Sequence, residues 1–197
     1  NLSGNFNSII AKQNAVLVYL GAESKGSRAQ KLQALDHKFA DIQKKLKKKS
    51  SKDEKKPKEL KRAEKVINML LSGEKPLLAY ADRATDLLAL LALKQKYGLD
   101  LVLVGASDAI LIADKISAAN VPVIISSIDN LPSSFDSLHG ALSNMGELVK
   151  AGVKVILAPK GESHNLNQLR FDAGIAVANG LATTEAFSAL TANVADV

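Results

Sequence analysis

Short runs of aliphatic and β-branched residues alternate with longer amphipathic stretches along most of the chain. Four of these runs, residues 76–81 (PLLAYA), 100–105 (DLVLVG), 121–126 (VPVIIS) and 153–158 (VKVILA), predict buried strands, and residues 15–20 (AVLVYL) predict an earlier one. Strands that alternate with helices form parallel sheets, and these runs are apolar on both faces. The pattern therefore predicts an α/β fold in which parallel strands alternate with helices and both faces of the sheet are covered.

The amphipathic stretches between these runs predict the helices. Asp82 or Thr85 is expected to cap the helix that ends before Gly98, Ser107 to cap the next one, and Thr183 to cap a late one. The helices are expected at residues 28–48, 60–71, 82–97, 107–119, 137–150, 167–178 and 184–192.

Function in a parallel α/β protein is carried by the loops that leave the carboxyl ends of the strands. Tyr80, Asp82, Arg83, Ser107 and Asn130 occupy such positions and are candidate substrate-binding residues. Two of them, Asp82 and Ser107, are also typical helix-start residues, so capping alone accounts for their presence.

A second candidate group follows the last predicted strand, in the segment ESHNLNQLR. His164, Asn165 and Arg170 could together bind an anion or a carbonyl group. The alternative is that Asn165 orders the loop and Arg170 forms an ion pair.

The net charge of +6 is concentrated in one segment. Residues 44–65 contain twelve Lys or Arg and four acidic residues, which leaves the rest of the chain at about −2. This segment has no aromatic residue for base stacking, and Ser50, Ser51 and Pro57 interrupt it. It is interpreted as a mobile, solvated helix–loop segment. A phosphate-binding patch is the alternative, and no nucleic-acid partner is expected.

Composition excludes several other classes of site. The chain has no cysteine, and it has no phosphate-loop, dinucleotide-binding or serine-elbow motif. No apolar run approaches the roughly 20 residues that a membrane span needs, so no membrane span is expected. The chain begins at Asn1, which suggests a processed product, so the lack of a signal peptide is uninformative. At 197 residues it is interpreted as a single α/β domain, too short for a closed eight-stranded barrel.

The chain resembles the amidohydrolase superfamily over about 120 residues. The resemblance lies in the segment from PLLAYADRATD through LVLVGASDA to ANVPVII, then in NMGELVKAGVKVILAP, HNLNQLRFDAGIAVANGL and EAFSALTANVADV, with GSRAQKLQAL upstream. The chain is most similar to the imidazolonepropionase-like branch, whose members are often secreted. This implies the later portion of a metal-dependent TIM barrel, a hydrolase acting on non-peptide C–N bonds, and a periplasmic or secreted location.

The resemblance also implies where metal ligands should lie, and none is present there. The positions of the fifth-strand and sixth-strand histidines fall at Tyr80 and Gly105, and that of the eighth-strand aspartate falls at Ala158 or Pro159. Of these residues only Tyr80 has a side chain that could ligate a metal, as phenolate, or donate a hydrogen bond. No metal and no cofactor is therefore expected in this segment, although typical family members bind zinc.

The histidines do not replace the missing ligands. His37, His139 and His164 lie at no metal-ligand spacing, and His37 and His139 are expected on exposed helix surfaces. Two functions remain open. The first is a C–N hydrolase by ancestry that acts on a small-molecule substrate. The second is a non-catalytic binding or interaction protein whose barrel has lost the metal ligands of the family. In both, the apolar sheet edges predict a partner, either the remaining portion of the barrel or another copy of the chain.

Overall fold

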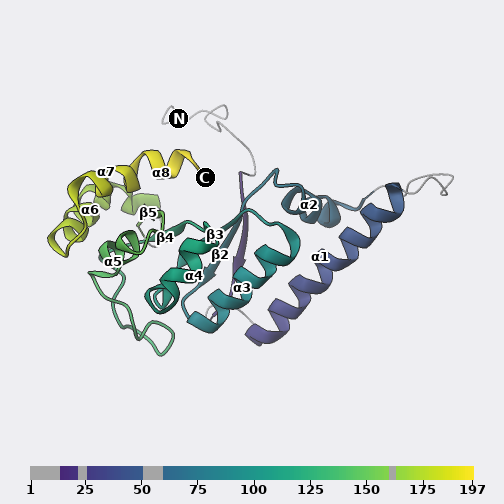
Figure 1. Cartoon of the computed structure of the whole chain (residues 1–197), viewed down its shortest axis with the longest axis horizontal. Helices are drawn as coiled ribbons and strands as arrows, with labels where there is room; N and C mark the ends of the chain where they lie inside the picture. The colour runs from purple at the N-terminus through teal and green to yellow at the C-terminus, as the bar shows by residue number, and fades with distance from the viewer. Residues whose placement is uncertain (1–13, 22–25, 51–59, 160–162) are drawn as a thin grey trace.

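The computed structural model of the chain describes residues 14–21, 26–50, 60–159 and 163–197 (Figure 1). Five parallel strands form one sheet, in which the spatial order follows the order along the chain. This confirms the predicted fold class, a parallel α/β arc like part of a TIM barrel. The strands are β1 (Val16–Tyr19), β2 (Leu77–Ala81), β3 (Leu101–Gly105), β4 (Val123–Ile125) and β5 (Val155–Leu157).

Helices connect consecutive strands and cover one face of the sheet. In Figure 1 helices α1 to α4 lie in the part of the molecule that is coloured from purple to teal, and helices α5 to α8 lie near β4 and β5. The helices are α1 (Arg28–Ser50), α2 (Arg62–Leu71), α3 (Ala84–Tyr97), α4 (Ala113–Ala118), α5 (Asn144–Lys150), α6 (Leu169–Ala178), α7 (Thr183–Leu190) and α8 (Ala192–Ala195), with 3-10 turns η2 (Ala109–Ile112) and η3 (Ser163–Gln168). None of the helices in the described part of the chain has both the length and the apolar character to span a bilayer.

The core lies between the sheet and these helices. Alternate strand residues such as Leu77, Leu103 and Val123 are at most 1% exposed, and they belong to one cluster with Phe39 and Ile116 from the helices. Burying one leucine side chain contributes about 1.5–3 kcal/mol to the stability of the folded state, so this layer is the main apolar contribution to the fold.

The opposite face of the sheet is open at β1 and β2, which corrects the expectation that both faces are covered throughout. On the same face Val102 of β3 and Ile156 of β5 are only 0% and 4% exposed. Leu17 and Tyr19 of β1 are 52% and 43% exposed, and their register partners Leu78 and Tyr80 of β2 are only partly buried. In a closed barrel the inner faces of opposite strands pack on one another. Within the described residues, five strands leave the inner face of β1 and β2 without such a neighbour.

The predicted helix at 137–150 is wrong in its first half. Helix α5 begins only at Asn144, and residues 126–143 form a long loop. Within this loop the hydroxyl of Ser137 accepts the backbone N–H groups of Ser133 and Ser134, at 3.2 and 3.1 Å, and that of Ser134 accepts the N–H of Asp136 at 3.2 Å. Such side-chain bonds to the backbone compete with helix formation.

The predicted helix caps are also wrong. The N-cap residues of α3 and α7 are Arg83 and Ala182, and neither makes a side-chain cap bond. The carboxylate of Asp108 instead accepts the first N–H of α3, from Ala84, at 3.1 Å. The stretch after Ser107 forms a 3-10 turn before α4 begins.

The structure describes both ends of the basic segment, residues 44–65. The first residues of the segment belong to helix α1, which ends at Ser50, and its last residues belong to α2, which begins at Arg62. An ion pair between Lys45 and Glu64 joins the two helices. Residues 51–59, where the mobile loop is expected, lie outside the described residues.

Candidate functional site

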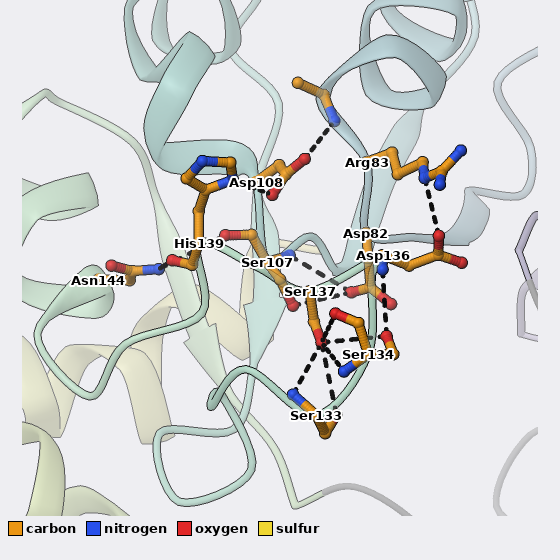
Figure 2. Close-up of polar contacts among 11 residues, drawn as sticks. Asp82, Arg83, Ser107, Asp108, Ser133, Ser134, Asp136, Ser137, His139 and Asn144 are labelled. Carbon is orange, nitrogen blue, oxygen red and sulfur yellow. Dashed lines mark hydrogen bonds and ion pairs between the residues drawn. The ribbon is translucent and has the colours of Figure 1, made fainter.

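A polar cluster lies at the carboxyl ends of β2 and β3 and includes residues of the loop that follows β4 (Figure 2). Parallel strands bring these ends to one edge of the sheet, where the sequence predicts substrate-binding residues. The structure brings three of the predicted residues together here, namely Asp82, Arg83 and Ser107.

Asp82 and Ser107 join the ends of β2 and β3. Oδ1 of Asp82 accepts the hydroxyl of Ser107 at 3.1 Å and its backbone N–H at 3.3 Å. The backbone reaches this position through Gly105 and Ala106, which have φ values of 83° and 50°. A Cβ atom on Gly105 would lie only 2.9 Å from Oδ1 of Asp82, so this carboxylate occupies the space that a side chain at 105 would need.

Asp108 and His139 form a hydrogen-bonded pair beside Asp82. Oδ1 of Asp108 lies 2.8 Å from Nδ1 of His139, while Oδ2 accepts the N–H of Ala84. The backbone of His139 is held by Asn144, whose buried amide donates to the His139 carbonyl at 2.7 Å. His139 therefore lies in a loop and interacts with a carboxylate, which corrects the expectation of a helix, whereas its side chain is exposed as expected.

An ion-pair network fastens the same loop to α1 and α3. Asp136 binds Arg28 of α1 and, at 2.7 Å, Nε of Arg83 at the start of α3. Nε of Arg28 also lies 3.3 Å from Oδ2 of Asp86. Burial raises the pKa of the Asp86 carboxyl, an effect that Arg28 and Arg83 oppose. Two cations and two carboxylates thus neutralise one another at this edge.

A shallow pocket of about 280 Å³ opens between the loop and the start of α3. Its polar wall contains Arg83, Thr85, Asp108 and His139, and its other wall is apolar. The apolar wall is made by Phe135 and Leu138, which are 85% and 56% exposed.

Tyr80 lies away from this cluster, on the open inner face of the sheet. Its ring stacks on that of Tyr19, with centroids 4.4 Å apart and an interplanar angle of 16°. Burial raises the pKa of the Tyr80 phenol, and the neighbouring Tyr19 adds to the effect. The phenol therefore stays protonated at neutral pH.

The remaining predicted residues are not brought to the cluster. Asn130 is 5% exposed, and its amide donates to the carbonyl of Ala141 at 3.0 Å, so it holds the loop together from within. His164 and Asn165 lie in η3, and Arg170 is exposed near the start of α6, on the β5 side of the sheet.

The residues at the implied metal positions do not fit a metal ion. Tyr80 is stacked on Tyr19, Gly105 has no side chain and a larger one would collide with Asp82, and Pro159 has no donor atom in its side chain. Within the described ranges, no group of three or more His, Asp or Glu side chains is placed to hold a metal.

Sequence reasoning missed Arg28, Asp136 and His139 as parts of this site. Arg28 is 108 residues from its partner Asp136, and His139 is 31 residues from Asp108. The one local signal is the serine-rich stretch around Asp136, which is unusual for a helix and typical of an ordered loop.

Comparison with known proteins identifies the fold. No protein-family model matches the chain, and no curated protein matches it. A crystal structure of an amidohydrolase from Thermotoga maritima MSB8 superposes with a TM-score of 0.85 at 20% sequence identity. The two share a fold. The match covers 95% of this chain and 52% of the other, so this chain spans about half the length of the protein it matches.

Proposed function

We propose that this chain is the later portion of an amidohydrolase-like barrel, and that the protein descends from hydrolases acting on non-peptide C–N bonds. The observation that carries the proposal is the superposition on an amidohydrolase over 95% of the chain. The polar residues at the carboxyl ends of β2 and β3 lie where a TIM barrel binds substrate, which further supports it. The imidazolonepropionase-like branch and a periplasmic or secreted location are parts of the same proposal, and both rest on the sequence resemblance.

The proposal makes no use of a metal bound by this segment, because Tyr80, Gly105 and Pro159 do not fit one. Metal-dependent hydrolysis in the full-length product would need ligands from outside the described residues. The polar cluster of Asp82, Arg83 and Ser107 would then contact the substrate and set specificity.

Metal analysis and hydrolysis assays of the full-length gene product test this function. We expect turnover of a small cyclic or N-acyl amide, and loss of that turnover in Arg83→Ala, with Arg170→Ala as the control on the β5 side. If a folded, metal-free protein turned over none of a set of cyclic and N-acyl amides, the hydrolase function would be rejected.

A non-catalytic binding protein is the second candidate, and a specific observation favours it. Asp82 fills the space that a ligand side chain at position 105 would need, and the Tyr19–Tyr80 stack covers part of the inner face. Under this function the full-length protein would bind a small amide without converting it. Calorimetric binding with no product formed would distinguish it from the hydrolase.

The open inner face supports a further part of the proposal, namely a partner that completes the barrel. The matched amidohydrolase has about as much chain again beyond the region that this chain matches. We therefore infer that equivalent barrel strands cover Leu17, Tyr19 and Leu78, and that the isolated chain would use a second copy instead.

A further inference from the structure

The Asp108–His139 pair has no role in the function proposed above, although the pocket beside it shares Arg83 with that site. An ionised carboxylate only accepts hydrogen bonds, so the 2.8 Å contact with Oδ1 of Asp108 places a hydrogen on Nδ1 of His139. In the neutral imidazole this leaves Nε2 as the acceptor. In Figure 2 the second ring nitrogen lies on the side away from Asp108.

The pair is held in place from both ends. Asp108 is fixed by the N–H of Ala84, and the backbone of His139 is fixed by the buried Asn144. The side chain of Asp108 is 13% exposed and that of His139 is 49% exposed. The carboxylate is therefore shielded from water, whereas the imidazole can be reached from the pocket that it lines.

The apolar wall of the pocket indicates a ligand with an apolar part. Phe135 and Leu138 line it side by side with His139 and are among the most exposed large hydrophobic residues of the described chain. Contiguous exposed apolar surface next to polar groups is typical of a binding site.

Charge indicates that this ligand is neutral. The cations near the pocket, Arg83 and Arg28, are already paired with Asp136 and Asp86. Asp108 adds a further negative charge, so an anionic ligand would meet net repulsion here.

We propose that this pocket is a metal-independent hydrolytic site for neutral carboxylic esters with a short apolar acyl chain, with His139 as general base. Nε2 takes a proton from water while the water oxygen bonds to the ester carbonyl carbon. The tetrahedral intermediate then loses its alkoxy group, and the imidazolium returns the proton to that oxygen. The products are a carboxylic acid and an alcohol. Asp108 stays ionised throughout, orients the ring and stabilises the imidazolium.

Ester hydrolysis by the full chain in the presence of a metal chelator tests this site. With 4-nitrophenyl acetate and butyrate as probes, His139→Gln should lower the protein-dependent rate by about a hundredfold, as expected for loss of a general base. His37→Gln is the matched control, because His37 is exposed on α1 far from the pocket, and it should leave the rate unchanged. Added imidazole should restore part of the rate in His139→Ala.

Asp108→Asn tests the positioning role of Asp108. It should lower kcat more than it raises KM, and thermal unfolding must show that the loss of its bond to Ala84 has left the chain folded. The charged groups nearest to His139 are Asp108, which it contacts, and Arg83, which lines the same pocket.

Equal rates in wild type, His139→Gln and His37→Gln would overturn the proposal, and so would a rate that the chelator abolishes. The outcome is separate from the proposed C–N hydrolysis, because that function is assayed with amides and in the presence of metal.

Discussion

Asp172 shows at the scale of one residue how a buried carboxylate organises the edge of the sheet. It lies in α6, is 1% exposed, and accepts the N–H of Ile128 at 2.9 Å and the hydroxyl of Ser126 at 3.1 Å. Burial raises the pKa of its carboxyl, and these two bonds only partly oppose the effect. Asp172 thereby fixes the first residues of the loop after β4, at the cost of keeping a charge in the interior.

We predict that Asp172→Asn changes the pH dependence of stability. A group whose pKa is raised by folding stabilises the folded state below its unfolded pKa, near 3.8, and loses that contribution as the pH rises through the folded pKa. Asparagine does not titrate, so the variant does not lose stability in this way. The difference in free energy of unfolding, variant minus wild type, should therefore increase as the pH is raised from about 4 to about 7. Denaturant unfolding at both pH values measures this, and a constant difference would contradict it.

Asp172→Ala is the comparison that isolates the hydrogen bonds. It removes both acceptors and leaves the Ile128 N–H unpaired, so the free energy of unfolding should fall by about 1–3 kcal/mol at neutral pH.

Among the elements, the loop of residues 126–143 departs most from the sequence-based prediction, and it also builds the site. Leu138, Ala141, Leu142 and Met145 repeat with helical spacing, which is why a helix was expected. In the structure Leu138 is exposed, and the loop is held by Asp136 and His139 to residues distant in sequence. Hydrophobic spacing carries no information about such long-range partners.

Asp136→Asn should loosen this loop without unfolding the domain. It weakens two charged hydrogen bonds, to Arg28 and Arg83, so we expect a loss of about 1–3 kcal/mol in the local opening free energy. Hydrogen exchange should accelerate in residues 131–140 and at the start of α3. Asp114→Asn, at an exposed position of α4, is the control and should change neither region. Uniform acceleration over the whole chain would contradict a local role.

The strands, in contrast, were predictable to within one or two residues. Their apolar runs are bounded by residues such as Gly21, Pro76 and Gly105, and helix α3 ends at Gly98, whose φ of 68° suits glycine at a helix C-terminus. The candidate site was only half predictable. Asp82, Arg83 and Ser107 follow directly from their positions after strands, whereas Arg28, Asp136 and His139 come from elements that only the folded chain brings together.

For the whole molecule, the two edges of the sheet are unequal. At β5 the amide of Asn193 donates to the carbonyl of Val155 at 2.8 Å, and α7 and α8 pack against the strand. The β1 edge, with Leu17 and Tyr19 exposed beside it, has no comparable cover among the described residues. An uncovered edge with apolar side chains favours association.

We therefore expect the 197-residue chain to self-associate through β1 when it is expressed without the rest of a barrel. Light scattering should show a dimer or larger species, and Leu17→Lys should shift it toward monomer by placing a charge on this face. Phe187→Lys is the control, because Phe187 is 65% exposed on α7, away from β1. A monodisperse wild-type monomer would contradict this expectation.

The contact between Asp82 and the end of β3 has a consequence for how position 105 can change. A side chain added at this position would meet the Asp82 carboxylate at 2.9 Å, and it would also have to adopt a backbone conformation that favours glycine. The carboxylate could move aside only by giving up its hydrogen bonds to Ser107. A substitution of Gly105 would therefore also loosen the link between the ends of β2 and β3.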